Sequence, residues 1–158
     1  AGKSFSLTGW KVGYVTAAPE LMKAIARTHQ FMTFTTPPNL QWGAATGLRL
    51  SDDYFSALAS DMQAKRDYLA DALARIGFEV LPAHGTYFVT TDFRPLGFNG
   101  TDEDFCRYIT VEAGVTAVPV SAFYDSSGAV PRHLARFCFC KHDDTLQKAV
   151  ERLQKKFK

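Results

Sequence analysis

The sequence predicts an α/β fold in which part of a large domain is followed by a small α+β domain. Segments with the helical spacing of apolar residues alternate with short runs rich in β-branched and aromatic residues, which indicates mixed helix and sheet. Residues 53–76 form one long helical pattern, about 35 Å at the usual helical rise, which is enough to bridge two domains. We therefore expect residues 1–50 to be the remnant of a large domain, 51–76 an interdomain helix and 77–158 the small domain.

The composition bounds the size of the core and the classes of partner. With 158 residues, 46% of them hydrophobic, the chain can bury a sizeable core. A net charge of +2 with mixed signs predicts neither nucleic-acid nor membrane binding, and no apolar run has transmembrane length. The three cysteines lack metal-ligand spacing, so we expect no metal site and free thiols in a reducing, cytoplasmic compartment.

In the first part of the chain, the pattern predicts a strand over residues 10–15 and helices over 19–31 and 39–50. Pro19 suits the first turn of the first of these helices. The segment 31–38 is aromatic and β-branched and ends in two prolines, which push the preceding residue into extended geometry. We expect it to be an extended apolar loop that something must cover.

The second part alternates helices and strands. The long helix carries an apolar stripe that ends at Gly77 and consists of Phe55, Leu58, Met62, Leu69, Leu73 and Ile76. Thr101 and Asp104 have the spacing of a capping box for the next helix, which Gly114 stops. The predicted strands are 78–81, 86–91, 115–120 and 133–140, and a last amphipathic helix is predicted from residue 143 to the end.

The opening stretch places two lysines close together in the sequence. Lys3 stands among small residues, and Lys11 follows a polar turn through Thr8 and Gly9. Two cations on one tight loop can serve a ligand that has both an electrophilic carbon and an anionic group. A lysine in a partly desolvated site favours the neutral amine, which is the form that makes a Schiff base. The alternative is two ordinary surface lysines.

Arg136 is a charged residue in an otherwise apolar predicted strand. Period-two alternation places it on the same face as Leu134, Cys138 and Cys140. A guanidinium on an apolar face is unfavourable unless an anion meets it, and its planar fork matches a carboxylate bound through two hydrogen bonds. The residues alone leave two partners open, namely a bound carboxylate or one of the 16 acidic residues of the chain.

The run from Lys3 to Gly13 resembles the active-site lysine motif of the class I, fold-type I aminotransferases that depend on pyridoxal 5'-phosphate (PLP). The family pattern has a lysine in a small-residue context, a glycine at the position of Gly9 and a cation at that of Lys11. The general family pattern has arginine at the position of Lys11. A lysine at that position resembles the subgroup of kynurenine aminotransferase, glutamine transaminase K and bacterial methionine aminotransferase. Further runs that resemble this subgroup are Gly-Thr-Tyr-Phe at 85–88, Pro-Val-Ser-Ala-Phe-Tyr at 119–124 and Arg-Phe-Cys-Phe at 136–139.

The resemblance implies roles for the three cations and for several aromatic residues. Lys3 would be catalytic and form the Schiff base with PLP, Lys11 would bind the PLP phosphate, and Arg136 would clamp the substrate carboxylate. Phe123 is a candidate wall of the substrate pocket. Phe34 corresponds to an aromatic residue that, in this subgroup, reaches the active site of the other subunit of a homodimer; ordinary packing within the chain is the alternative. Two further aromatic residues, Tyr87 and Phe88, are expected in the core.

The implied function is PLP-dependent transamination of an amino acid to a 2-oxo acid, with methionine, glutamine, an aromatic residue or kynurenine as donor. A cysteine-conjugate β-lyase would use the same lysine. A non-catalytic α+β module would leave Lys3 on the surface and Arg136 in a structural ion pair. The family residues that meet the pyridine nitrogen, the ring and part of the phosphate would precede Ala1, so we expect the chain to be a C-terminal portion that is inactive alone.

Overall fold

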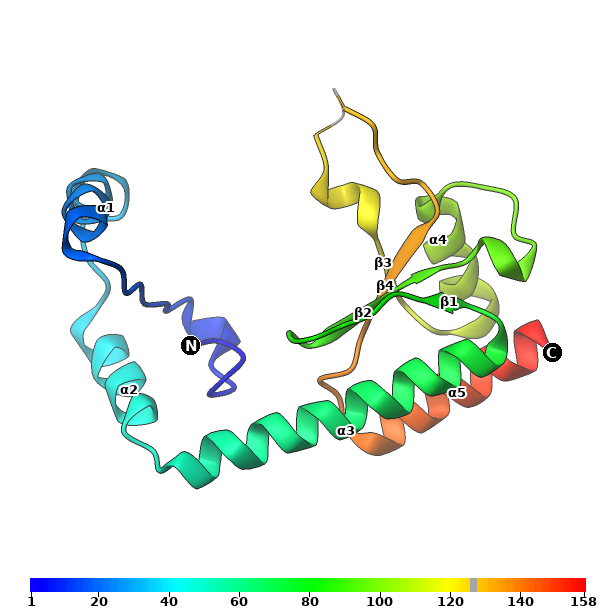
Figure 1. Cartoon of the computed structure of the whole chain (residues 1–158), viewed down its shortest axis with the longest axis horizontal. Coiled ribbons are helices and arrows are strands. Elements are labelled where there is room, and N and C mark those ends of the chain that lie inside the picture. Colours follow the sequence, from blue (N-terminus) through cyan, green and yellow to red (C-terminus); the bar gives the residue numbers. More distant parts are fainter. Residues whose placement is uncertain (126–127) are drawn as a thin grey trace. The chain divides into compact units, whose positions relative to one another are not determined.

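The structure, a computed structural model, describes residues 1–125 and 128–158 and divides the chain into two units. We call Ala1–Leu58 unit 1 and Ala59–Lys158 unit 2. The division falls within the long helix α3 (Asp52–Ile76), labelled in Figure 1, so this helix contributes residues to both units. The domain limits expected from the sequence stay a prediction.

Unit 1 consists of helices joined by irregular segments. Its elements are the 3-10 helix η1 (Thr8–Trp10), α1 (Pro19–Met32), α2 (Pro38–Leu48) and the first turns of α3. Both α1 and α2 begin at a proline, whose missing N–H costs little there because the first N–H groups of a helix have no helical acceptor. The helices predicted over 19–31 and 39–50 therefore form with slightly shifted ends, and Phe31 and Met32 belong to α1 instead of the extended segment.

The strand predicted over residues 10–15 is wrong. η1 ends at Trp10, and residues 11–18 have no regular secondary structure. A strand needs a neighbouring strand for its backbone hydrogen bonds, and no residue that the structure describes in unit 1 belongs to a strand. The apolar and β-branched residues of this segment predicted a strand, but nothing in unit 1 can pair with it.

Unit 2 is built on an antiparallel sheet with the strand order β1-β2-β4-β3. The strands are β1 (Glu79–Val80), β2 (Phe88–Asp92), β3 (Val118–Pro119) and β4 (Leu134–Cys138). Arg136 on β4 lies opposite Thr90 of β2 on one side and Val118 of β3 on the other. Each predicted strand of unit 2 forms. β3 is shorter than the predicted 115–120, because residues 115–117 lie outside the strand and the chain continues after Pro119 as the 3-10 helix η3 (Val120–Phe123).

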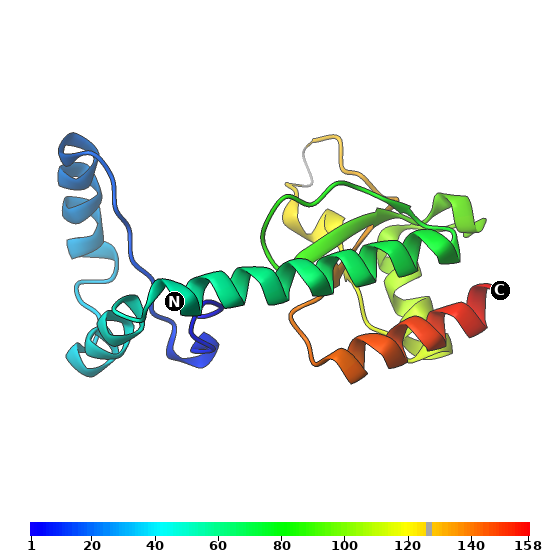
Figure 2. The same ribbon diagram turned by 60° about the horizontal axis from the view of Figure 1, so that its bottom comes forward.

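Helices α3, α4 (Asp102–Ala113) and α5 (Asp143–Phe157) pack against this sheet, as Figures 1 and 2 show. The capping box predicted for α4 is confirmed. The Asp104 N–H donates to Thr101 Oγ1 (3.2 Å), and the Thr101 N–H donates to Asp104 Oδ2 (3.0 Å). α4 ends at Gly114, whose φ of +65° lies in the left-handed region that favours glycine.

The core of unit 2 lies between the sheet and these helices. Its buried apolar residues are Leu69, Ala72, Leu73, Ile76, Phe78, Val89, Phe93, Phe105, Cys106, Ile109, Val115, Ala117, Ala135, Phe137, Phe139, Leu146, Val150 and Leu153. Phe93 and Phe105 stack with ring centroids 4.2 Å apart. The short 3-10 helix η2 (Arg94–Leu96) follows β2. Unit 2, which carries Arg136, therefore has a well-packed core.

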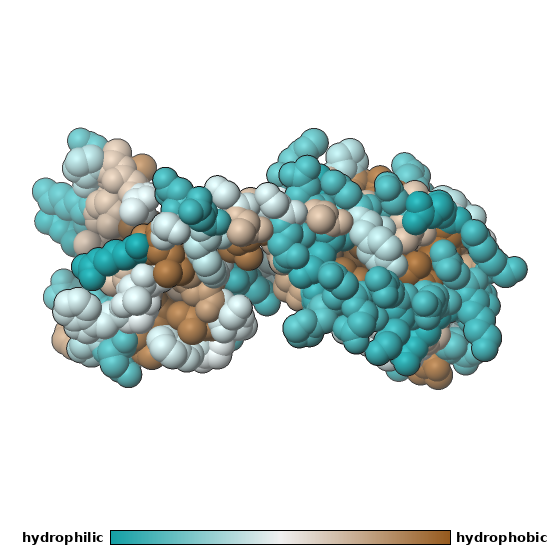
Figure 3. All heavy atoms as spheres, turned by 90° about the horizontal axis from the view of Figure 1, so that it is seen from below, coloured by the Kyte–Doolittle hydropathy of each residue, from teal (hydrophilic) through white to brown (hydrophobic). Residues whose placement is uncertain are grey.

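Unit 1 buries much less. Among its residues only Ala44 is fully buried, whereas Phe31, Met32, Phe34 and Trp42 expose 87%, 80%, 76% and 67% of their surface. In Figure 3, brown patches of hydrophobic residues gather over unit 1, at the left, while the visible face of unit 2 is mostly teal. Of the described helices, none is long and apolar enough to cross a membrane.

Candidate active site

Lys3 lies in a turn that is closed by backbone and side-chain hydrogen bonds. The Phe5 N–H donates to the Ala1 carbonyl (3.1 Å), and Thr8 Oγ1 donates to the Gly2 carbonyl (3.0 Å). A Cβ at Gly2 would lie 3.2 Å from the Thr8 Cα, so a glycine permits this close approach of two backbone segments. The turn leaves Lys3 exposed. We call residues 2–11 the lysine loop.

Lys11 ends the lysine loop in a strained conformation. It is the C-terminal cap of η1, with φ 55° and ψ 39°, and it is exposed. A residue with a Cβ pays about 1 kcal/mol or more in the left-handed region, and such strain is often kept at ligand-binding sites. The structure therefore places both predicted cofactor-binding lysines on one short exposed loop of unit 1.

Arg136 lies between two phenylalanine rings. Its guanidinium carbon is 4.3 Å from the ring centroid of Phe88 and 4.3 Å from that of Phe123. Phe88 lies on β2 and Phe123 on η3, which directly follows β3, and β2 and β3 are the two strands that flank β4 in the sheet. The predicted alternation is confirmed, because Ala135 and Phe137 are buried while Arg136 is half-buried on the other face. Phe88 was expected in the core and instead lies on the Arg136 face.

In the part of the chain that the structure describes, Arg136 has no acidic partner. Among residues 1–125 and 128–158, its guanidinium forms no ion pair with a carboxylate. Cation–π contacts cover the faces of a guanidinium but leave its N–H groups at the edge available as donors. Of the two partners that the sequence left open, the structural ion pair is absent from the described chain, which favours a bound carboxylate.

A buried carboxylate holds η3, the element that carries Phe123. Asp102, at the start of α4, is fully buried, and its Oδ2 accepts a hydrogen bond from the Ser121 N–H (2.7 Å). Its Oδ1 has no hydrogen-bond partner in the part of the chain that the structure describes. Burial, together with the charge of Asp102, raises the pKa of the Cys106 thiol to about 12, so this thiol stays protonated. The sequence contains no local signal for the Asp102 contact.

Phe34 follows α1 in a left-handed conformation with φ 67°. Its N–H donates to the His29 carbonyl (3.0 Å), and its side chain is 76% exposed. Both predicted environments for Phe34, a partner subunit and other parts of the same chain, stay open. The convergence of Lys3, Lys11 and Arg136 also stays a prediction, because the lysines belong to unit 1 and Arg136 to unit 2.

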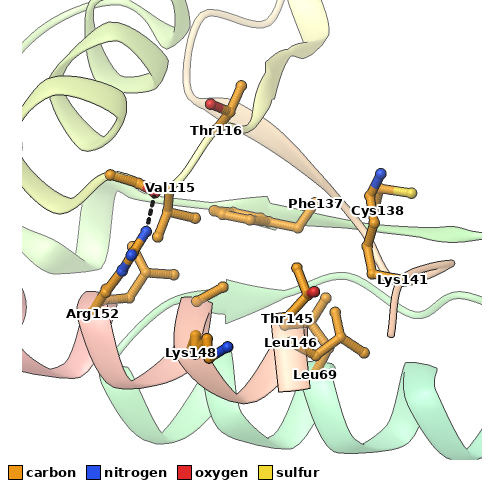
Figure 4. Close-up of a pocket in the computed structure, with 13 residues that line it drawn as sticks. Leu69, Val115, Thr116, Phe137, Cys138, Lys141, Thr145, Leu146, Lys148 and Arg152 are labelled. Carbon is orange, nitrogen blue, oxygen red and sulfur yellow. Dashed lines mark hydrogen bonds between the residues drawn. The ribbon is translucent and has the colours of Figure 1, made fainter. Parts of the chain in front are cut away.

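A separate cavity of about 270 Å³ in unit 2 is shown in Figure 4. It lies between the sheet and α5, with Leu69, Phe137 and Leu146 among its apolar lining. Two of its cations are engaged, because Arg152 donates to the Gly114 carbonyl (3.0 Å) and Lys148 forms an ion pair with Asp144. No residue predicted for the active site lines this cavity.

Comparison with known proteins defines the class of protein. The sequence profile of the family described as aminotransferase class I and II matches residues 1–153, and the chain belongs to this family. The family and fold class predicted from the sequence are therefore confirmed. The class I relatives are PLP-dependent enzymes.

Several relatives align with almost the whole chain. It is 39% identical over 160 residues to the probable N-succinyldiaminopimelate aminotransferase of Mycobacterium tuberculosis and 39% identical over 173 residues to the kynurenine–oxoglutarate transaminase of Dictyostelium discoideum. It is 38% identical over 153 residues to the methionine aminotransferase of Escherichia coli. These alignments cover 97%, 98% and 97% of this chain but only 40%, 40% and 39% of the relatives. The chain thus spans about two fifths of their length.

Solved structures agree with this assignment. The N-succinyldiaminopimelate aminotransferase of M. tuberculosis superposes with a TM-score of 0.85 at 40% identity, covering 98% of this chain and 40% of that one. The methionine aminotransferase structure from E. coli gives a TM-score of 0.84 at 38% identity, covering 98% and 40%. Both comparisons support the same fold over nearly all of the chain.

The lysine loop fits two chemical groups of PLP. Lys3 presents an amine that can react with the aldehyde carbon, and Lys11 presents an ammonium that suits the phosphate. Apart from the adjacent residues, no atom of the described chain lies within 4 Å of a Cβ added at Gly9 or Gly13, which leaves open space beside the backbone near Lys11. The donor set therefore suits the aldehyde and phosphate ends of the cofactor.

Proposed function

We propose that the protein containing this chain catalyses PLP-dependent transamination of an amino acid to a 2-oxo acid. The observation that carries this proposal is the state of Arg136, held between two rings and without a carboxylate partner in the described chain. Such a group suits the carboxylate that all amino-acid and 2-oxo-acid substrates share. Membership of the aminotransferase family supports the same conclusion.

Arg136 would bind and orient the substrate. The rings of Phe88 and Phe123 restrict the guanidinium and shield it from water, which strengthens its hydrogen bonds to an anion. A carboxylate would approach the exposed N–H edge and accept two parallel hydrogen bonds. Fixing the carboxylate in this way also fixes which bond at the substrate α-carbon is presented for reaction.

Lys3 and Lys11 would divide the remaining work on the lysine loop. When bound, PLP supplies an electron sink for the substrate α-carbon. Lys3 Nζ would accept the proton from that carbon and hold it for return, as a general base and then a general acid. Lys11 would hold the phosphate by charge and hydrogen bonding.

The aromatic residues favour large neutral donors. Phe123 lies on Arg136 and is 59% exposed, so it can contact a substrate side chain next to the carboxylate. With Phe34, it supports methionine, glutamine, aromatic amino acids or kynurenine as the donor. The relatives named for kynurenine and methionine fit this range.

The complete protein is proposed to be a cytoplasmic homodimer. Exposed apolar residues of unit 1, among them Phe31, Met32 and Phe34, support a partner surface, and the free cysteines fit a reducing compartment. The isolated chain is proposed to bind PLP weakly and to be inactive. Sedimentation of the complete protein tests the assembly, and a monomer at micromolar concentration would contradict it.

The proposed function is tested through Lys3 in the complete protein. Borohydride reduction in the presence of PLP should leave a phosphopyridoxyl group on Lys3, detected by peptide mass spectrometry. Lys3→Ala should lower the rate of transamination by about 10³-fold or more, because the proton carrier is lost. Lys23→Ala removes an exposed lysine from α1 and serves as the matched control. Labelling spread over many lysines, or full activity of Lys3→Ala, would overturn the proposal.

A further inference from the structure

A tyrosine of α3 reaches the backbone of the lysine loop. Tyr54 Oη donates a hydrogen bond of 2.5 Å to the carbonyl oxygen of Ser4, the residue that follows Lys3. The two partners are 50 positions apart in the sequence, and both belong to unit 1. Tyr54 is half-buried in the first turn of α3, whereas Ser4 is exposed. The loop is therefore attached to a helix immediately beside its catalytic candidate.

The same tyrosine takes part in a cluster of three rings. Phe5 stacks on Tyr54 with centroids 6.2 Å apart and an interplanar angle of 21°, and it meets Phe55 edge-on at 6.2 Å. Tyr54 and Phe55 are themselves in edge contact at 5.3 Å. Because Phe5 comes two residues after Lys3, these contacts restrict the same segment as the hydrogen bond to Ser4.

Helix α2 supplies a second support. A Cβ at Gly47 would lie 2.9 Å from the Phe5 ring, and a Cβ at Gly43 would lie 2.5 Å from the Trp10 ring. Gly43 and Gly47 are four residues apart and so share one face of α2. The rings of Phe5 and Trp10 therefore pack against glycines of α2, so the lysine loop contacts both α2 and α3.

From these contacts we propose that Tyr54 is a positioning residue for Lys3. The proposal rests on the proposed function, because it assumes that Lys3 is the reacting lysine. The hydrogen bond from Tyr54 fixes the Ser4 carbonyl, and the ring cluster fixes Phe5, so the Lys3 Cα keeps one position relative to α2 and α3. An error of about 1 Å in the placement of a reacting group can cost on the order of 100-fold in rate. Tyr54 thus acts through the loop and does not touch the substrate.

Tyr54→Phe separates the hydrogen bond from the packing. The substitution keeps the ring that stacks on Phe5 and removes only the hydroxyl group. Tyr68→Phe is the matched control, because Tyr68 lies on the same helix, is 39% exposed and makes no hydrogen bond within the described chain. Since the Ser4 carbonyl is exposed and water can replace the tyrosine, the variant should still fold.

The first measurement uses the complete protein without cofactor. Amide hydrogen exchange of residues 3–10, followed by mass spectrometry, reports the local opening of the lysine loop. The amides of residues 3–10 should exchange about fivefold faster in Tyr54→Phe than in the parent protein. This is the fold-change expected for the loss of one net hydrogen bond. Tyr68→Phe should exchange like the parent. Equal exchange in the two variants would overturn the proposed positioning role.

The second measurement uses the complete protein with PLP. Tyr54→Phe should lower kcat about tenfold while KM stays within about twofold, because misplacement of Lys3 affects the reacting state more than substrate binding. The circular dichroism band of the bound cofactor should weaken, since its orientation is less fixed. If Lys3 is trapped by borohydride but Tyr54→Phe matches Tyr68→Phe in kcat and dichroism, this inference alone fails. If Lys3 is not trapped, the proposed function fails.

Discussion

Unit 1 and unit 2 bury apolar side chains to very different degrees. Unit 2 packs a continuous core between a sheet and three helices, whereas unit 1 fully buries only Ala44 and leaves Phe31, Met32 and Trp42 mostly exposed. Apolar burial must offset the conformational entropy of every ordered residue. Unit 2 can therefore support its own fold, but unit 1 needs further protein surface against its apolar residues. The lysine loop lies in the unit that lacks a core, while Arg136 lies on the one that has it.

The largest expected effect is a difference in local stability between the two units of the isolated chain. Amides of α4 should exchange only through global unfolding, whereas those of α1 should exchange through local opening. With a typical domain stability, the difference corresponds to about 5 kcal/mol of protection. Hydrogen exchange with mass spectrometry of residues 1–158 measures it. Equal protection of α1 and α4 would show that the two units do not differ in local stability.

A pair of matched substitutions compares the two units at single residues. Phe105 is fully buried and contacts the rings of Phe93 and Phe78, so Phe105→Ala should lower the free energy of unfolding by about 4 kcal/mol. In the isolated chain, Phe31→Ala removes the same ring from a site that is 87% exposed and should change stability by less than about 0.5 kcal/mol. Urea unfolding followed by circular dichroism measures both. A Phe31→Ala loss as large as that of Phe105→Ala would show that unit 1 has a core of its own.

The smallest effect is a pH dependence within unit 2. Burial raises the pKa of Asp92, but the hydrogen bonds and charge of Arg94, assisted by His133, more than offset it and hold that pKa below its usual value. A carboxyl group whose pKa is lowered in the folded state stabilises the fold at pH values above its unfolded-state pKa of about 3.9. This stabilisation is lost as the pH falls through the folded-state pKa. Arg94→Ala should raise the Asp92 pKa, so acid unfolding should begin at a higher pH.

The control for the acid titration is Arg75→Ala, which removes an exposed arginine of α3 that makes no ion pair in the described chain. It should leave the acid transition unchanged. Identical transitions for Arg94→Ala and the parent chain would contradict the role of this ion pair.

Local signals explain which parts of the fold were predictable. The helices were placed well because Pro19, the Thr101–Asp104 capping box and Gly114 mark their ends within a few residues. The strand prediction over residues 10–15 was wrong, because a strand depends on a pairing partner that the local sequence does not reveal. The strand predicted over 115–120 was too long, because residues 115–117 are apolar or β-branched but pair with no neighbour in the described sheet.

The candidate site was predictable only where a pattern or a family motif marks the residues. Alternation in β4 placed Arg136 correctly, and the resemblance pointed to Phe123, which the structure brings onto the guanidinium. Phe88 was expected in the core, but the structure places its ring against the Arg136 guanidinium. The contacts of Tyr54 with Ser4 and of Asp102 with Ser121 join residues far apart in the sequence, so no local pattern could indicate them.

The strand order of unit 2 has a consequence for synthesis on the ribosome. β4 occupies the position between β2 and β3, yet both of those strands precede it along the chain. Until Leu134–Cys138 has emerged from the exit tunnel, β2 and β3 each present an edge with unsatisfied backbone groups. A nascent chain that pauses shortly before this point would expose both edges at once, and its release there would favour aggregation over folding.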